Sequence, residues 1–376
     1  MNEEFRKYRE MAEAYIPTIP PVDPKAYSGR GIIMLAGGLR YFPGAYINIR
    51  LLRYLGVTLP IEVWYLNEKE MTLHIRSIME SLGVTLINAE DYYKDKPATI
   101  RGGWELKTYS IINSKFREIL FLDSDSYAVK NPEFLFSTPE FREHGAIFWP
   151  DFECLRDDAA ILEIAGIPWE KECREWETGQ IVIDKVKNWR PLHLAMHYNE
   201  HSHFYFRHVF GDKATFQTAY QKLNHPHFLI KKRVVDLHRK VMLQHSTDGT
   251  LLFQHRNRAK YIITGINNYI PDFVNEDLCV KFLNELSNIY YNAELADTWV
   301  YDINNNDKRD MELIHGGKIG KGANDLERSW CVVNGILHIS GEYEPGTMAF
   351  LRVSPDRWEG RWRANEGHPV TLTRVK

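Results

Sequence analysis

The chain has 376 residues, enough for one large domain with an appendage or for two domains. Apolar residues make up 44% of the sequence and charged residues 26%, which is typical of a soluble globular protein. With 47 Lys and Arg against 50 Asp and Glu the chain is nearly neutral, so its net charge gives no support for a nucleic-acid or anionic-membrane partner.

The cysteines and the N-terminal segment bear on where the protein works. Its 4 cysteines are widely spaced and form no Cys-x-x-Cys pair, which argues against a zinc site and a disulfide scaffold. The segment up to Tyr15 is charged and resembles a short amphipathic helix more than a signal peptide. No stretch approaches the roughly 18 apolar residues that a membrane span needs. We therefore expect a cytoplasmic protein with no integral membrane segment, at most peripheral at a membrane.

Strand and helix patterns alternate along most of the chain. A helical arm and a Pro-rich linker occupy residues 1–28. The patterns predict strands at 31–36, 59–66, 84–87, 118–122, 145–149 and 180–184, and helices at 45–54, 71–82 and 106–114. This alternation predicts an α/β sheet with helices on both faces, in which ligands bind at the carboxyl ends of the strands.

The pattern changes in the last third of the chain. We expect the α/β domain to cover residues 29–265 and a helical connection, with an amphipathic helix at 276–291, to cover 266–313. Short strands and turns such as Asn334-Gly335 follow, which predicts a small β-rich module at 314–376.

The most informative stretch is Phe-Leu-Asp-Ser-Asp at 121–125, at the end of the apolar run 118–122. Side chains alternate along a strand, so the carboxylates of Asp123 and Asp125 point the same way. Two hard oxygen ligands at a strand end suit Mg²⁺ or Mn²⁺, ions that commonly serve a phosphate-bearing substrate. Asp-x-Asp matches are common, and taken alone this one would be a polar turn.

Two glycine-containing segments precede this strand. Gly37 and Gly38 follow the first strand, where glycine lets backbone N–H groups approach a ligand, and Tyr41 could stack on a base. An ordinary turn would have the same sequence. Lys107 follows Gly-Gly-Trp at 102–104 and could meet a phosphate as a point charge, although most helical lysines face solvent.

Polar residues also flank the later elements. Asp151 at a strand end is a candidate to bind a hydroxylated ligand, whereas Trp149 beside it is more often a core residue. Glu177 and Gln180 offer a carboxylate and an amide to sugar hydroxyls, unless they only cap a loop. Asp212 has the position of a helix N-cap unless its loop also lines the pocket.

A second strong element is Phe-Gln-His-Arg-Asn-Arg-Ala-Lys at 253–260. His255 could supply a nitrogen ligand to the same cation, while Arg256 or Lys260 meets phosphate. A separate histidine cluster lacks the glutamate of a His-Glu-x-x-His zinc motif, and we interpret it as an acceptor-side loop or a surface helix. Its members are His193, His197, His201, His203 and His208.

Taken in order, these segments resemble the fungal α-mannosyltransferase family that extends mannan and N-glycan outer chains with α-1,2 and α-1,3 linkages. The resemblance covers roughly residues 30–265. Its pattern is Gly-Gly, Gly-Trp-x-x-Lys, Leu-Phe-Leu-Asp-x-Asp, Asn-Pro-Glu, Phe-Trp-Pro-Asp, Glu-x-Gly-Gln, Gly-Asp-Lys and Phe-x-His-Arg-Asn. The wider class is that of GT-A glycosyltransferases.

The resemblance implies a GT-A-like, Rossmann-type sheet that binds a nucleotide-diphosphate sugar, with GDP-mannose the best guess, and Mn²⁺ or Mg²⁺. It implies retaining transfer of a hexose to a hydroxyl of a glycan acceptor. By position, the implied residues are Asp123, Asp125 and His255 for the metal; Gly37, Gly38, Tyr41, Lys107, Asp123, Asp125, Arg256 and Lys260 for the donor; Asp212 and Trp149 for the acceptor; and Gln180, Glu177 and Asp151 for catalysis.

Two other functions stay open at this point. The chain could be a catalytically inactive carbohydrate-binding protein with a lectin-like tail, although the retained acidic pair, His255 and Lys107 speak against decay. It could also glycosylate a modified nucleobase in DNA, which a local basic stripe leaves possible if that stripe is more than a solvated face. The stripe comprises Lys231, Lys232, Arg233, Arg239, Lys240, Arg256 and Arg258.

Overall fold

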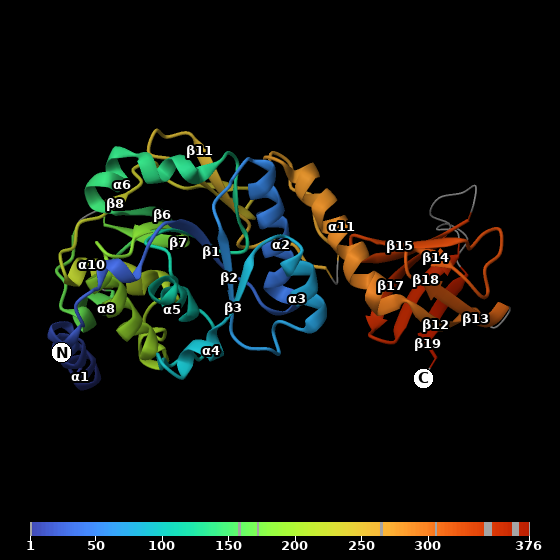
Figure 1. Cartoon of the computed structure of the whole chain (residues 1–376), viewed down its shortest axis with the longest axis horizontal. Coiled ribbons are helices and arrows are strands. Elements are labelled where there is room, and N and C mark those ends of the chain that lie inside the picture. The colour runs from blue at the N-terminus through green and yellow to red at the C-terminus, as the bar shows by residue number, and fades with distance from the viewer. Residues whose placement is uncertain are drawn as a thin grey trace. The chain divides into compact units, whose positions relative to one another are not determined.

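The structure is a computed structural model that describes residues 2–156, 159–170, 173–263, 266–304, 307–341, 348–362 and 368–375. The chain divides into two compact units, Met1–Lys260 and Tyr261–Lys376 (Figure 1). Residue 265, where we expected the α/β domain to end, lies outside the described residues.

The first unit contains a mixed sheet with the strand order β3-β2-β1-β4-β7-β6-β8. Its strands are β1 (Arg30–Leu35), β2 (Ile61–Tyr65), β3 (Thr85–Asn88), β4 (Glu118–Leu122), β6 (Ala146–Cys154), β7 (Arg174–Asp184) and β8 (Phe228–Leu229). The first four of these strands run parallel, whereas β7 is antiparallel to both β4 and β6. The predicted α/β sheet is therefore confirmed.

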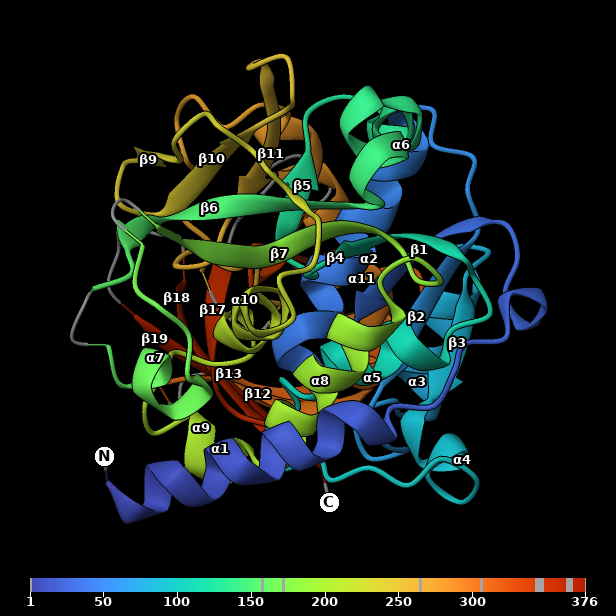
Figure 2. The ribbon, with the colours of Figure 1, turned by 90° about the vertical axis from the view of Figure 1, so that its left-hand side faces the viewer.

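Helices cover this sheet because its central strands are apolar along almost their whole length, the pattern of strands buried on both faces. In Figure 2, α5, α8 and α10 lie together on one face. The helices of the unit are α1 (Glu3–Tyr15), α2 (Gly38–Tyr54), α3 (Leu73–Glu80), α4 (Ala89–Tyr93), α5 (Leu106–Asn113), α6 (Pro139–His144), α7 (Ala160–Ala165), α8 (Trp189–Glu200), α9 (Ser202–Tyr205) and α10 (Lys213–Lys222), with 3-10 turns η1 (Ile16–Thr18), η2 (Pro24–Ala26) and η3 (Pro132–Ser137).

A second, smaller sheet has the order β5-β11-β10-β9. It consists of β5 (Ser126–Ala128), β9 (Val235–Leu237), β10 (Val241–His245) and β11 (Leu251–His255). In the antiparallel pair of β5 and β11, His255 lies opposite Ser126. Because β5 begins directly after Asp125, this pairing brings a histidine from far along the chain to the acidic pair.

Helix α1 packs on the histidine-rich part of the unit (Figure 2). Tyr8 Oη lies 2.9 Å from His203 Nε2, and the rings of Tyr15 and His197 are stacked with centroids 4.5 Å apart. The prediction of a surface helix is wrong for α8, which carries His193 and His197 and is largely buried. Aromatic side chains of α1 contact the other members and His197, whereas His193 packs against Trp189.

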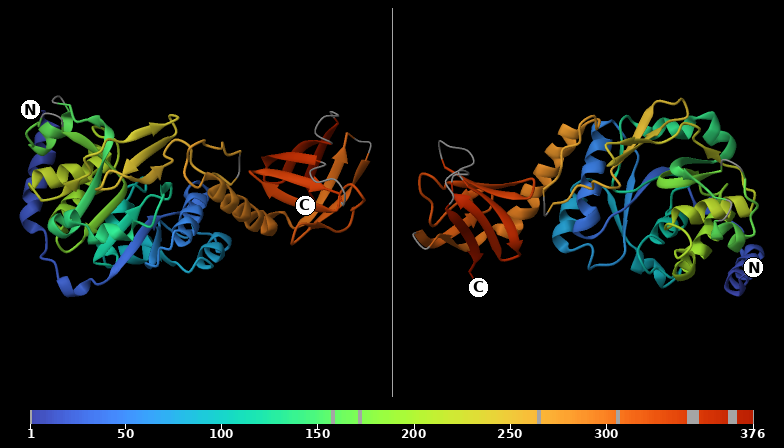
Figure 3. Two further views of the ribbon diagram at one scale, coloured as in Figure 1. Left: turned by 90° about the horizontal axis from the view of Figure 1, so that it is seen from above. Right: turned by 180° about the vertical axis from the view of Figure 1, so that it is seen from behind.

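The second unit consists of α11 (Glu276–Leu295) and a closed β-barrel, seen in Figure 3. The barrel strands are β12 (Asp297–Ile303), β13 (Asp307–Ile314), β14 (Lys318–Ile319), β15 (Ser329–Val333), β16 (Ile336–Ser340), β17 (Met348–Ser354), β18 (Arg357–Trp362) and β19 (Pro369–Arg374). Among the described residues, no helix is both long and apolar enough to cross a bilayer.

The small β-rich module is confirmed, but its start differs from the prediction. Residues 297–313, assigned to a helical connection, lie mostly in β12 and β13. In β13, buried Met311 and Leu313 alternate with exposed charged residues such as Lys308 and Asp310. Because β13 contains many charged residues, its period-two pattern of buried and exposed side chains is difficult to recognise in the sequence.

The buried histidines of α8 should make the stability of the protein depend on pH. Burial lowers the pKa of His193 and of His197 to about 4, against an ordinary value of 6.5. A depressed pKa means that the folded state favours the neutral ring. The contribution of each neutral ring to the free energy of unfolding is therefore fully present above pH 6.5 and is lost as the pH falls towards 4.

We expect His197→Phe, which keeps a ring beside Tyr15, to reduce the loss of unfolding free energy between pH 7 and pH 5 by about 2 kcal/mol. Urea unfolding at both pH values measures this loss. The matched control is His238→Asn, in an exposed turn at positive φ that Asn tolerates. An unchanged pH dependence in His197→Phe would show that this ring does not carry the effect.

Candidate functional site

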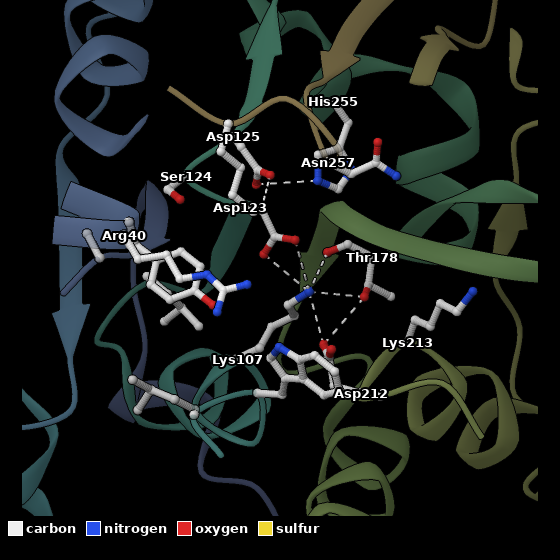
Figure 4. Close-up of a pocket in the computed structure, with 18 of the residues that line it drawn as sticks. Arg40, Lys107, Asp123, Ser124, Asp125, Thr178, Asp212, Lys213, His255 and Asn257 are labelled. Carbon is white, nitrogen blue, oxygen red and sulfur yellow. Dashed lines mark hydrogen bonds and ion pairs between the residues drawn. The ribbon is translucent and has the colours of Figure 1, made fainter. Parts of the chain in front are cut away.

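A cavity of about 560 Å³ opens in the first unit at the carboxyl end of β4. The carboxyl ends of β1 and β4 lie side by side, since Met34 pairs with Leu122, and both strands deliver their following loops to this edge. Residues from β6, β7, the loop before α10 and the segment after β11 complete the lining (Figure 4).

Asp123, Asp125 and His255 come together at the centre of this cavity. One ligand atom from each lies within 4.8 Å of the others, and His255 Nε2 is 3.3 Å from Asp125 Oδ1. Asp125 and His255 are buried, whereas the Asp123 side chain is partly open to the cavity. The structure thus brings the three predicted metal ligands together.

The charges around Asp125 compensate one another. Burial alone would raise the pKa of this carboxyl group, but His255 and the ammonium of Lys260 outweigh that effect and hold the pKa well below its usual range. Burial alone would lower the pKa of His255, but the carboxylates of Asp125 and Glu177 raise it to about 9. Asp125 therefore stays ionised at neutral pH, paired with His255 and Lys260.

Two carboxylates and one imidazole form a donor set that fits a divalent cation. Carboxylate oxygens suit Mg²⁺ and Mn²⁺, and imidazole nitrogen is a common ligand of transition-metal ions. Lys107 pairs with Asp123, and Lys260 pairs with Asp125. Each of the two carboxylates therefore has a cationic partner in this structure.

Lys107 lies at the floor of the cavity and is buried rather than on the protein surface. Its Nζ lies 3.3 Å from Asp123 Oδ1 and 3.0 Å from Asp212 Oδ2, and it donates to the Thr178 carbonyl at 2.9 Å (Figure 4). Burial works against the charged form, but the two aspartates prevail and the pKa of Lys107 is raised. Lys107 thus joins the end of β4 to β7 and to the start of α10.

Asp212 turns its side chain towards Lys107. It occupies the N-cap position of α10, but its carboxylate makes no capping hydrogen bond there. Burial raises the pKa of Asp212 even though Lys107 lowers it. The structure therefore places Asp212 in the cavity wall, as predicted for a residue that lines the site, rather than in the role of a simple helix cap.

Glu177 reaches the site because β7 is antiparallel to β4. Asp123 N–H donates to the Gly179 carbonyl at 2.7 Å, so this part of β7 lies beside the acidic pair. Glu177 Oε1 lies 3.6 Å from His255 Nδ1, and burial raises the pKa of the carboxyl group. Gly179 is necessary for this approach, since a Cβ there would lie 2.6 Å from His255 Nδ1.

Two predicted residues of the sugar site do not line the cavity among the residues that the structure describes. Gln180 is fully buried, and its Oε1 accepts a hydrogen bond from Ser126 Oγ at 2.9 Å. Trp149 is fully buried, and its Nε1 donates to the His245 carbonyl at 2.7 Å. The catalytic role of Gln180 and the acceptor role of Trp149 stay predictions, and in this structure both side chains join the two sheets.

Two predicted donor residues are also absent from the described lining. Arg256 is buried, and its Nε donates to the Ala259 carbonyl at 2.9 Å within its own turn. Gly38 N–H donates to the Glu70 carbonyl at 2.8 Å and so is not directed at a ligand. These two N–H groups therefore donate to backbone carbonyls of the loops that carry the site.

The remaining predicted residues line the cavity, and several unpredicted ones join them. Gly37, Tyr41, Asp151 and Lys260 are in the lining. Residues that sequence reasoning did not select include Arg40, Thr178, Lys213 and Asn257. Each of these lies inside or next to a motif that was noticed, so treating whole motifs as candidates would have found them.

Comparison with known proteins adds to this geometry. Residues 29–177 match a family described as "Mannosyltransferase putative". The α-1,2-mannosyltransferase MNN5 of Saccharomyces cerevisiae is 27% identical over 292 residues, which cover 62% of this chain and 50% of MNN5. MNN24 of Candida albicans, also an α-1,2-mannosyltransferase, is 28% identical over 243 residues, covering 54% of this chain and 34% of that protein.

The first unit is thus similar to the fungal-type α-mannosyltransferases over residues 29–177 and beyond. This chain spans about half the length of the curated relatives that it matches. Among solved structures, the galactosyltransferase LgtC is similar with a TM-score of 0.38 and 13% identity, covering 53% of this chain and 72% of LgtC. The bifunctional glycosyltransferase WbbM has a TM-score of 0.39 and 9% identity, covering 73% and 53%. These TM-scores are too low to bear on function.

Removal of the buried ammonium of Lys107 should destabilise the protein. We expect Lys107→Met to lower the free energy of unfolding by roughly 3–5 kcal/mol, because Asp212 would then be left as an uncompensated buried charge and Asp123 would lose a cationic partner. The double variant Lys107→Met with Asp212→Asn should recover part of this loss, since it removes one of the two charges.

Denaturant unfolding measures both changes, and the matched control is Lys69→Met on an exposed lysine, expected to change stability by less than about 0.5 kcal/mol. If Lys107→Met proved no more destabilising than the control, the ammonium would not be the group that stabilises this acidic cavity.

Proposed function

We propose that the chain is a metal-dependent, retaining glycosyltransferase that moves a hexose from a nucleotide-diphosphate sugar to a hydroxyl of a glycan. Mannose carried by GDP is the leading candidate for the sugar. The observation that carries the proposal is the meeting of Asp123, Asp125 and His255 in a large cavity at the carboxyl end of the sheet. The relatives named α-1,2-mannosyltransferases support the choice of sugar.

The residues of one side of the cavity suit a nucleoside diphosphate. Arg40 and Tyr41 follow Gly37 at the carboxyl end of β1, and Lys260 Nζ lies 6.0 Å from the centre of the Tyr41 ring. An aromatic ring offers a stacking surface to a base, and the two cationic groups attract a diphosphate. This combination favours a donor bound across the acidic pair.

Breaking the bond between sugar and diphosphate increases the negative charge on the leaving group. A cation held by Asp123, Asp125 and His255 would stabilise that charge electrostatically. Arg40 and Lys260 add positive charge from the chain itself. Glu177 and Asp212 are carboxylates in the wall of the same cavity, where they can orient hydroxyl groups.

Retention is compatible with two routes in this cavity. In the route that we favour, the acceptor hydroxyl attacks from the face that the diphosphate leaves, and the leaving phosphate takes the proton. In the rival route a carboxylate forms a covalent glycosyl intermediate. Glu177 is the wall carboxylate available for it, because Asp151 pairs with the ammonium of Lys213 and Asp212 with that of Lys107.

The DNA-directed alternative finds no support in the described residues. Lys231, Lys232, Arg233 and Arg239 are exposed, but Arg256 is buried, so the basic stripe is not one continuous exposed face. We therefore retain a glycan as the acceptor.

Substitution of one buried ligand tests the proposal. We expect Asp125→Asn to lower Mn²⁺-dependent hydrolysis of the donor by at least about 10³-fold, because it weakens the cation site that stabilises the leaving diphosphate. Released nucleotide is measured across a panel of nucleotide sugars that includes GDP-mannose, with and without EDTA. Asp248→Asn, on an exposed carboxylate outside the cavity, serves as the matched control.

Circular dichroism and urea unfolding establish that Asp125→Asn is folded. Full activity of the folded variant, or wild-type turnover that EDTA leaves unchanged, would rule out the metal assignment. A wild-type protein that releases no nucleotide from any donor of the panel would contradict the proposed function itself.

A further inference from the structure

Besides Tyr41, three aromatic side chains of the cavity lining are exposed. Trp104 is 47% exposed, Phe152 is 40% exposed and Phe210 is 78% exposed, although rings of this size are normally buried in the core. They come from three separate segments, before α5, in β6 and before α10, and all three face the same cavity. An exposed group of aromatic rings at a cavity is typical of a binding surface.

The local backbone fixes this group of rings. The ring centroids of Trp104 and Phe210 are 6.2 Å apart with an interplanar angle of 42°, and Phe206 packs against the indole at 5.9 Å. Gly211 has φ +72°, and a Cβ there would come within 2.9 Å of the Trp104 ring. The loop therefore needs glycine at this position to let the indole lie against it.

Charged groups lie directly beside the rings. Lys213 Nζ is 5.7 Å from the centre of the Phe210 ring, pairs with Asp151 and lies 3.3 Å from Glu175 Oε2. Flat apolar faces next to oriented carboxylate and ammonium groups match a sugar ring, which has C–H faces and hydroxyl edges. The chemistry of this surface is thus that of a carbohydrate site.

The surface lies away from the cationic part of the cavity. Figure 4 shows Arg40 on one side of the acidic pair and Lys213 on the other, with Asp212 between them and below. A diphosphate favours the side of Arg40 and Lys260. On the aromatic side, Asp151 and Glu175 compensate the positive charge of Lys213. Lys213 can therefore donate hydrogen bonds to a neutral ligand, but it contributes no net positive charge that would attract an anion.

We infer that Trp104, Phe152 and Phe210 form a platform for a sugar ring of the glycan acceptor, with Asp151 and Lys213 binding its hydroxyl groups. This inference rests on the proposed function and names the acceptor site of the same cavity. The platform positions the acceptor hydroxyl towards the acidic pair and the bound donor. It takes no part in breaking the donor bond.

Kinetics with a simple acceptor test the platform. With GDP-mannose, Mn²⁺ and methyl α-mannoside, we expect Phe210→Ala to raise the KM for the mannoside about tenfold, since one aromatic face against a sugar contributes about that factor. The KM for GDP-mannose, measured by hydrolysis without acceptor, should stay within about twofold of wild type. Phe210→Tyr, which keeps the ring, should restore the acceptor KM.

The matched control is Phe134→Ala, an exposed phenylalanine of η3 outside the cavity, which should change neither KM. A rise in the donor KM with an unchanged acceptor KM would assign the rings to the nucleotide sugar and overturn the inference. Equal KM values in Phe210→Ala and wild type would overturn it as well.

Binding without turnover separates failure of the platform from failure of the proposed function. Saturation-transfer NMR with methyl α-mannoside should show contact with the wild-type protein and a loss of the signal in Phe210→Ala. If the wild type shows this contact but no turnover with any donor, the proposed function fails and the platform stands. If the wild type turns over a donor but shows no contact that depends on Phe210, the platform fails alone.

Discussion

The first unit depends on one electrostatic constraint, which is the compensation of several carboxylates that line a single cavity. Asp123, Asp125, Glu177 and Asp212 come from different strands and loops, and like charges in one cavity destabilise a fold unless cations intervene. Lys107 provides the buried cation. Because one ammonium contacts both Asp123 and Asp212, the positions of β4, β7 and α10 are set together at this point.

The same constraint explains the chain topology around the site. An all-parallel sheet would bring only strand ends to the cavity, whereas antiparallel β7 brings the middle of a strand, and with it Glu177 and the Thr178 carbonyl that Lys107 needs. The pairing of β5 with β11 then adds His255 beside Asp125. Gly179 has no side chain, which leaves space for the His255 imidazole. The placement of His255 in β11 therefore depends on a glycine in β7.

The parts of the site that could be predicted are those that local patterns encode. An apolar strand followed by Asp123 and Asp125 indicates both the strand end and the direction of its carboxylates. Burial of other polar residues depends on partners far along the chain: Gln180 bonds to Ser126, and Trp149 to the carbonyl of His245. Gln180 was selected for its amide group and Trp149 through the family resemblance, whereas these hydrogen bonds join the two sheets. The start of the barrel was missed for a related reason, since β13 has charged residues on its outer face.

The two lysines on the acidic pair differ in a way that bears on how the cavity changes when a cation is bound. Lys107 is enclosed by Asp212 and Thr178 as well as Asp123, so it keeps partners even if one contact is lost. Lys260 is partly exposed and pairs with Asp125 from the cavity side. Under the proposed function, a cation at Asp125 would compete with Lys260 for the same carboxylate, and Lys260 Nζ lies 6.0 Å from the centre of the Tyr41 ring on the proposed diphosphate side. Binding of the cation and attraction of the diphosphate would then be coupled through this one side chain, while Lys107 keeps its contacts with Asp212 and Thr178.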